Sequence, residues 1–165
     1  MNELRELRSI AREIFDAALA AVDARRAVLD AVELDGASLR VGEARFSLRQ
    51  GLPVYSVALG KAAAAMASAL DERLGGALAR GVVSAPASDF ELSARWRVYE
   101  GGHPLPNAAS VEAARAAFEL LREADERAAL VIFLISGGGS AMMELSRDPR
   151  VTLEELRAAN RVLVS

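Results

Sequence analysis

The sequence of 165 residues contains no cysteine and only one histidine, His103. Without cysteine, neither a disulfide framework nor a thiolate metal site can form, and a single histidine cannot build an ordinary histidine metal site. We therefore expect no metal ligands among the site residues. The absence of cysteine is also typical of the cytoplasm, which is the localisation we expect.

The sequence also lacks a large excess of positive or negative charge, because 20 basic residues nearly balance 23 acidic ones and the formal net charge is −3. Such a balance exerts no broad attraction on nucleic acid or on an anionic membrane, so neither is an expected partner. Residues 1–22 are charged and periodic and contain no long apolar run, which argues against a signal peptide or a membrane span. Any anion must therefore be bound by local groups.

Lysine is almost absent, since Lys61 is the single lysine among the 20 basic residues and the others are arginine. A coding bias that replaces lysine wherever arginine serves would leave lysine where a compact ammonium group is required. Lys61 is therefore the first candidate for a functional residue.

Hydrophobic residues, by contrast, make up 52% of the chain, which is enough to fill the core of one domain. Apolar runs and helical periodicity divide the chain into alternating strands and helices. Strands are predicted at 52–60, 79–88, 95–102 and 128–136, a small hairpin at 38–51 around Gly42, and helices at 4–22, 61–76, 107–125 and 153–164. This order predicts an α/β fold with a mainly parallel sheet and helices on both sides, a three-layer αβα arrangement.

Several local signals refine this prediction. The strand at 128–136 is the most apolar and lacks alternation, so both of its faces are expected to be covered. Asn107 or Ser110 is expected to cap the helix at 107–125, and Thr152 and Glu155 form a capping box before the last helix. The chain stops inside or just after that helix, without a closing strand, so we expect it to be part of a longer protein.

In open parallel sheets, ligands bind beyond the carboxyl ends of the strands, where loops and helix N-termini meet. The first loop there contains Gly60, which ends a strand, and Lys61, which is expected in the first turn of the next helix. The helix dipole disfavours a cation at that position by roughly 0.3–1 kcal/mol, so we expect an anion to bind beside Lys61. The alternative is a solvated lysine that happens to follow a turn.

Two further loops are expected at the same edge of the sheet. One consists of Ser136, Gly137, Gly138, Gly139 and Ser140. Glycine N–H groups approach phosphate oxygens closely, and the two hydroxyl groups are further donors. Alternatively, the three glycines only allow a tight turn. The other loop holds His103 between glycines and prolines, where the imidazole can be a general base, a hydrogen-bond donor to substrate or a loop-packing group.

Three familiar motifs are excluded by position. A P-loop would need glycine where Tyr55 stands and serine or threonine where Ala62 stands. A dinucleotide fingerprint and a nucleophile elbow would both need a small residue in place of Met142. We therefore expect neither a Walker A site, nor a classical NAD site, nor a hydrolase triad.

The segments VALGKAAAAMASAL, GGHPLPNAASVEAARAAFELL and FLISGGGSAMMEL, in this order and at these separations, resemble the N-terminal domain of the glycerate 2-kinase family, the MOFRL-containing glycerate kinases. The resemblance runs from the first helix to the last residue, and some members carry the older label hydroxypyruvate reductase. It implies a Rossmann-like domain that is followed by a second domain, with the active site between them. Residues 1–165 would then be a truncated N-terminal domain, with the C-terminal domain absent.

The resemblance also implies an activity, namely the phosphorylation of D-glycerate at its 2-hydroxyl group by ATP with Mg²⁺, which gives 2-phosphoglycerate. Lys61 would be catalytic, and the loop from Ser136 to Ser140 would bind substrate or phosphate, with Gly60 and His103 as further binding residues. D-glycerate and nucleotide would be the partners, and the apolar edge of an unfinished domain predicts homo-oligomers. Two other interpretations stay open: a non-catalytic fragment or ligand-binding module and, more distantly, a hydroxypyruvate reductase, which Met142 opposes.

Overall fold

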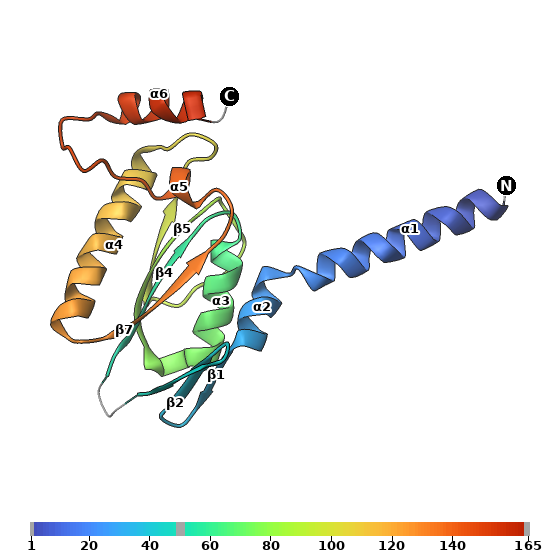
Figure 1. Ribbon diagram of the computed structural model, residues 1–165, viewed down its shortest axis with the longest axis horizontal. Coiled ribbons are helices and arrows are strands. Elements are labelled where there is room, and N and C mark those ends of the chain that lie inside the picture. The colour runs from blue at the N-terminus through green and yellow to red at the C-terminus, as the bar shows by residue number, and fades with distance from the viewer. Residues whose placement is uncertain (1, 49–51, 164–165) are drawn as a thin grey trace.

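A computed structural model describes residues 2–48 and 52–163 of the chain. Its elements, in chain order, are α1 (Asn2–Ala21), α2 (Ala24–Ala31), β1 (Val32–Asp35), β2 (Ser38–Val41), β3 (Ala44–Ser47), β4 (Val54–Leu59), α3 (Ala63–Leu74), the 3₁₀ helix η1 (Gly75–Ala77), β5 (Leu78–Ala85), β6 (Trp96–Glu100), α4 (Ala108–Glu126), β7 (Leu130–Ile135), α5 (Gly139–Met142) and α6 (Leu153–Leu163). Figure 1 shows a sheet between helices, with α1 projecting from the body. Residues 49–51, at the end of the predicted hairpin, and residue 164, at the end of the predicted last helix, lie outside the described residues.

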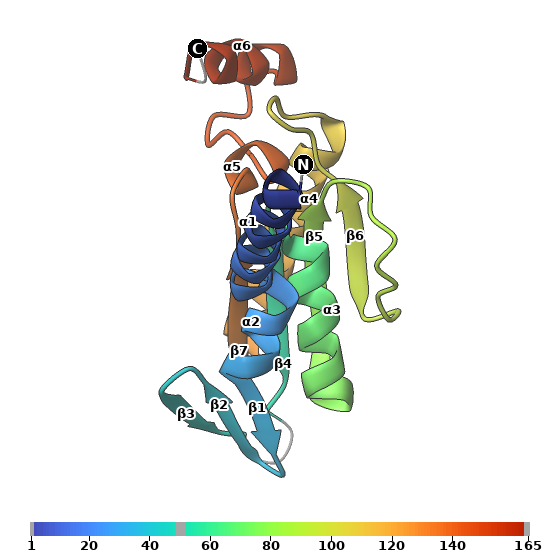
Figure 2. The ribbon, with the colours of Figure 1, turned by 90° about the vertical axis from the view of Figure 1, so that its right-hand side faces the viewer.

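The central sheet has four parallel strands in the order β6-β5-β4-β7. α3, with α2 beside it, packs on one face of this sheet, and α4 packs on the other face (Figure 2). β4 has neighbours on both sides and is buried along nearly its whole length, because helices cover both faces. The predicted α/β fold with a parallel sheet in three layers is confirmed.

β7 shows that the expectation of two covered faces for the strand at 128–136 is wrong. Ile132 and Leu134 are buried on the α3 side, but Phe133 is 52% exposed and Ile135 is 68% exposed. Among the described strands β7 pairs only with β4, so it is an edge, and α4 lies mainly over β5 and β6. An apolar groove of about 380 Å³ is left between β7 and α4.

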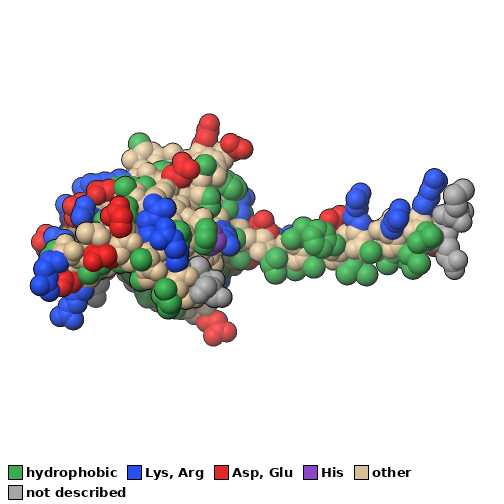
Figure 3. Space-filling view, turned by 90° about the horizontal axis from the view of Figure 1, so that it is seen from above, with side chains coloured by type: hydrophobic (Ala, Val, Ile, Leu, Met, Phe, Trp, Pro, Cys, Tyr) green, Lys and Arg blue, Asp and Glu red, His purple; other side chains and the backbone are tan. Residues whose placement is uncertain are grey.

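α1 is the amphipathic helix that the spacing of apolar residues predicts, but its apolar face is not covered. The large apolar side chains between Leu4 and Leu19 are 46% to 66% exposed. Figure 3 shows them in green along one side of the projecting helix. An apolar stripe of this kind is typical of a surface that contacts a partner, and the homo-oligomer stays a prediction. Within residues 2–48 and 52–163, no helix combines the length and apolar character that a bilayer crossing requires.

A small antiparallel sheet, in the order β1-β2-β3, precedes the central one. The predicted hairpin is confirmed as β2 and β3, which turn at Gly42 with φ of +59°. The sequence does not predict α2 and β1, because elements of 8 and 4 residues show little periodicity.

Both predicted helix starts are confirmed. The Asn107 side chain accepts a hydrogen bond from the Ser110 N–H at 2.8 Å, and Ser110 Oγ accepts one from the Asn107 N–H at 3.1 Å. Before α6, the Thr152 N–H donates to the Glu155 carboxylate at 2.7 Å, and the Glu155 N–H donates to Thr152 Oγ1 at 3.3 Å. These reciprocal bonds satisfy N–H groups that have no partner inside a helix.

Hydrogen bonds to Asp71 link α3 to the loop that precedes β6. The Asp71 carboxylate accepts hydrogen bonds from the Ser93 hydroxyl at 3.0 Å and from Arg95 Nη2 at 3.0 Å. Burial raises the pKa of Asp71, but the hydrogen bonds from Ser93 and Arg95 outweigh it, so the pKa lies below its ordinary value. The charged carboxylate therefore stabilises the fold above about pH 4, and this stabilisation is lost as the pH falls through the folded-state pKa.

We predict that Asp71→Asn lowers the free energy of unfolding by about 1–2 kcal/mol at pH 7. The difference should shrink below about pH 4, because the wild-type carboxyl group then takes up a proton. Urea unfolding at pH 7 and pH 3 measures both effects. Glu112→Gln, which breaks an exposed pair with Arg115, is the control and should cost less than about 0.5 kcal/mol. An equal cost of Asp71→Asn at both pH values would contradict the prediction.

Candidate active site

The candidate site lies where the order of the parallel strands reverses. From β4 the chain continues to β5 and β6 on one side and then returns to add β7 on the other side of β4. Ligands of open α/β sheets bind at such a switch point, beyond the carboxyl ends of the strands. The loops that follow β4 and β7 are therefore neighbours, and they contain Lys61 and the segment from Ser136 to Ser140.

Gly60 ends β4 with φ of +111°, a conformation that favours glycine. Its N–H donates to the Ser84 carbonyl at 3.1 Å, and the Lys61 N–H donates to the Gly137 carbonyl at 2.9 Å. α3 begins only at Ala63. The prediction that Lys61 lies in the first turn of the helix is therefore wrong: Lys61 lies in the turn before it, because bonds to the facing loop continue past the end of the strand.

The hydroxyl group of Ser136 is engaged with this turn. Ser136 Oγ accepts a hydrogen bond from the Ala62 N–H at 3.0 Å. A Cβ atom built on Gly60 would lie 2.4 Å from both Oγ and the carbonyl oxygen of Ser136. The two loops are therefore in direct contact, and only glycine fits at position 60.

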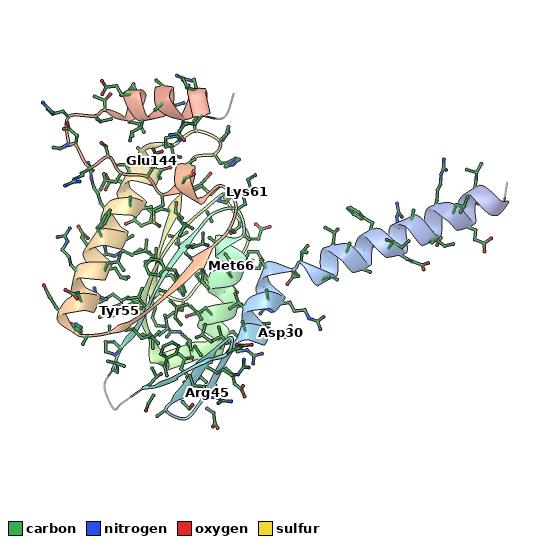
Figure 4. All side chains as sticks on the ribbon, viewed as in Figure 1. Asp30, Arg45, Tyr55, Lys61, Met66 and Glu144 are labelled. Atoms are coloured by element: carbon green, nitrogen blue, oxygen red, sulfur yellow. The ribbon has the colours of Figure 1, made fainter. Side chains whose placement is uncertain are left out.

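Lys61, His103 and Gly138 converge at one point of the surface. Gly138 has φ of +85°, and a Cβ atom built on it would lie 2.7 Å from His103 Cδ2 and 3.4 Å from Lys61 Cε. Both side chains are exposed. Figure 3 shows His103 in purple beside a blue side chain, and Figure 4 shows Lys61 near the start of α3. The structure therefore brings the three predicted loops together.

The His103 loop is held by the capped start of α4. The Gly102 N–H donates to Ser110 Oγ at 2.9 Å, and the Asn107 side-chain amide donates to the Glu100 carbonyl at 3.0 Å. The peptide bond between His103 and Pro104 is cis. Contacts on both sides of His103 keep its imidazole beside the glycine loop.

The glycine loop presents free backbone donors. Among the described residues, the N–H groups of Gly137 and Gly138 have no hydrogen-bond partner. Gly139 is buried, and a Cβ atom on it would lie 3.0 Å from Leu59 Cδ1, whereas Ser140 is exposed on α5. Free amide N–H groups beside an ammonium group form a surface suited to an anion.

Two buried polar residues that bond to the chain just beyond the glycine loop were missed by the sequence analysis. Ser84 of β5 is fully buried, and its hydroxyl donates to the Met142 carbonyl just beyond the glycine loop. Asn160 of α6 is buried, and its amide donates to the Glu144 carboxylate at 2.9 Å; Figure 4 shows Glu144 near α5. A polar residue inside an apolar strand or helix face is the signal that could have identified both.

Lys61 and His103 of the site are exposed to solvent. Cavities of about 630 Å³ and 550 Å³ lie elsewhere, the first at the amino ends of β5 and β6 and the second between α4 and α6. Across the part of the chain that the structure describes, no group of three or more His, Asp or Glu side chains could hold a metal ion. An ammonium group, an imidazole and free amide N–H groups that lie together are suited to bind an anion and neutralise its charge.

The fold places the chain in the class of open parallel α/β domains, whose ligand sites generally lie at the switch point of the sheet. Residues 10–165 match the family described as "Domain of unknown function (DUF4147)", and the chain belongs to this family.

Relatives with established names extend this finding. The chain is 35% identical over 159 residues to the glycerate 2-kinase of Pyrococcus horikoshii. This match covers 96% of this chain and 35% of that protein. The chain is also 37% identical over 173 aligned positions to the glycerate kinase of Homo sapiens. That match covers 94% of this chain and 32% of the human protein. The crystal structure of glycerate kinase from Thermotoga maritima matches with a TM-score of 0.73 at 32% identity, over 97% of this chain and 35% of that chain.

The resemblance to the glycerate 2-kinase family is confirmed by these matches. The chain spans about a third of the length of the three relatives.

Proposed function

We propose that this chain forms one side of the active site of a glycerate kinase, which transfers a phosphoryl group from ATP to the 2-hydroxyl group of D-glycerate. The proposal depends above all on the convergence of Lys61 with the free N–H groups of Gly137 and Gly138 at the switch point of the sheet. The names of the relatives supply the substrate class.

Phosphoryl transfer needs alignment of the reactants and neutralisation of charge more than covalent participation of the protein. In this proposal the Lys61 ammonium group neutralises negative charge on the transferred group. The amides of Gly137 and Gly138 bind phosphate oxygens or the glycerate carboxylate, and His103 donates a hydrogen bond to the same anion. Mg²⁺ would be held mainly by the phosphate oxygens of ATP, because it commonly keeps few protein ligands there.

The exposure of the site residues suggests that a second surface takes part. Charge neutralisation is stronger where water is excluded, yet Lys61 and His103 are exposed. We propose that the second surface comes from the roughly two-thirds of the relatives' length that this chain does not span. The same observation favours a second candidate function for the chain alone, a module that binds nucleotide or glycerate without chemistry.

A phosphorus NMR time course with MgATP and D-glycerate, run on a protein that contains this chain together with the proposed second surface, tests the kinase proposal. We expect a growing phosphoglycerate signal, whose chemical shift and coupling distinguish 2-phosphoglycerate from 3-phosphoglycerate. A reaction without D-glycerate measures background hydrolysis of ATP.

The other outcomes separate the remaining candidates. No product, together with binding of MgATP or D-glycerate in calorimetry, favours the binding module. Neither product nor binding would contradict both proposals. Fluorescence titration with NADH or NADPH tests the distant alternative of a hydroxypyruvate reductase.

A further inference from the structure

The turn that carries Lys61 lacks a cap of its own. Ala62 is the N-cap residue of α3, and its apolar side chain cannot accept a hydrogen bond from the start of the helix. The first N–H groups of a helix have no partner within it, so a group from elsewhere has to supply one. Ser136 Oγ, which follows Ala62 by 74 positions, accepts the Ala62 N–H at 3.0 Å.

Three bonds of 3.0 Å or less hold the Lys61 turn against the glycine loop, in addition to a longer one from Ser136 Oγ to the Leu59 carbonyl. The Ser136 N–H donates to the Leu59 carbonyl at 3.0 Å, the Lys61 N–H donates to the Gly137 carbonyl at 2.9 Å, and the Ala62 N–H donates to Ser136 Oγ at 3.0 Å. The first two join backbone groups, which any residue type provides. Of the three, only the third depends on a side chain, so it is the short bond for which the residue at position 136 matters.

The donor and one of the two acceptor lone pairs of the Ser136 hydroxyl are already in use, so no O–H is left to donate to an anion. Oγ accepts from the Ala62 N–H and donates to the Leu59 carbonyl at 3.5 Å. It also lies against Gly60, where a Cβ atom would come within 2.4 Å of it. The hydroxyl is therefore turned toward the turn that precedes α3, while the free amides belong to Gly137 and Gly138.

We infer that Ser136 is a positioning residue, which fixes the backbone on both sides of Lys61 and does not itself bind phosphate or glycerate. This replaces the ligand-binding role that the sequence predicts for its hydroxyl group. The inference deepens the proposed function and rests on it for the role of Lys61. The hydrogen bond to Ala62 can be tested without any ligand.

The single lysine of the chain makes the test specific. Reductive methylation with ¹³C labels only Lys61 and the terminal amine of the chain. The experiment follows the Lys61 signal during a titration with MgATP and, separately, hydrogen exchange of the Ala62 N–H. The wild type is compared with Ser136→Ala, with Ser136→Thr, which keeps the hydroxyl, and with a matched control.

Ser56→Ala is the matched control. The Ser56 hydroxyl is fully buried and donates to the Ile132 carbonyl at 2.9 Å, so it links β4 to β7 without a hydrogen bond to the Lys61 turn. A variant that only weakens the β4–β7 pair should behave like Ser56→Ala.

We expect Ser136→Ala to speed exchange of the Ala62 N–H by about tenfold and to weaken the response of the Lys61 signal to MgATP by a similar factor. Ser136→Thr should restore most of both, and Ser56→Ala should change neither. Unchanged Ala62 exchange in Ser136→Ala would overturn the inference. If the MgATP response were lost while Ala62 exchange stayed unchanged, the hydroxyl would be a ligand contact, which also overturns it. If the Lys61 signal of the wild type does not change on addition of MgATP, the result contradicts the proposed function. Hydrogen exchange of the Ala62 N–H still tests the role of Ser136 in that case.

Discussion

Lys61→Ala should reduce phosphoryl transfer to D-glycerate by roughly 100- to 1,000-fold, because a preorganised group that neutralises charge in the transition state is usually worth that much. Lys61 Cε lies beside Gly138 and the free amides of the glycine loop, and no other lysine in the sequence can replace it. The phosphorus NMR time course measures the change. Calorimetry should show weaker binding of MgATP by the same variant.

Two further variants control the Lys61 result. Lys61→Arg keeps the positive charge but spreads it over a planar group, so it should retain part of the binding and lose most of the turnover. Arg115→Ala removes an exposed cation that pairs with Glu112 on α4, and it should leave turnover unchanged. If Lys61→Ala kept near-normal turnover, the catalytic assignment would be wrong.

Gly60→Ala should lower the free energy of unfolding by about 3 kcal/mol or more, or prevent folding. Position 60 has φ of +111°, and the new Cβ atom would lie 2.4 Å from the carbonyl oxygen and Oγ of Ser136. The hydroxyl can rotate, but the carbonyl belongs to the backbone beside β4 and cannot. The turn itself would have to move and would displace Lys61. Urea unfolding followed by circular dichroism measures the loss.

Gly137→Ala is the matched control for Gly60→Ala, because it adds the same methyl group in the facing loop. A Cβ atom on Gly137 would meet no atom within 4 Å. Its effect on the free energy of unfolding should stay below about 0.5 kcal/mol. Equal stability of the two variants would show that the Gly60 turn adapts to a side chain, contrary to the prediction.

Helix starts were predictable from sequence because their partners are close together along the chain. Asn107 and Ser110 lie three positions apart, as do Thr152 and Glu155, and both pairs form the expected reciprocal bonds. The packing of apolar faces was less predictable. Periodicity identified the stripe of α1 and the apolar run of β7, but it does not report what lies over them, and both leave large side chains exposed.

The candidate site shows the same division. The loops with Lys61, His103 and the three glycines could be placed at one edge, because the carboxyl ends of parallel strands meet there. The exact place of Lys61 could not, because its N–H bonds to Gly137 and the next N–H bonds to Ser136. These contacts join residues more than 70 positions apart, as the separation of 74 between Ala62 and Ser136 shows.

The α/β class, the helix caps and the residue types available at the site follow from the amino-acid sequence alone. These depend on composition and on contacts within a few positions, which a linear pattern records. Three features are visible only in the folded chain: β7 joins β4 at an edge of the sheet, Ser136 Oγ bonds to the Lys61 turn, and His103 and Lys61 flank Gly138. Strand order and loop contacts depend on side-chain packing across whole faces of the sheet, and no single segment contains that information.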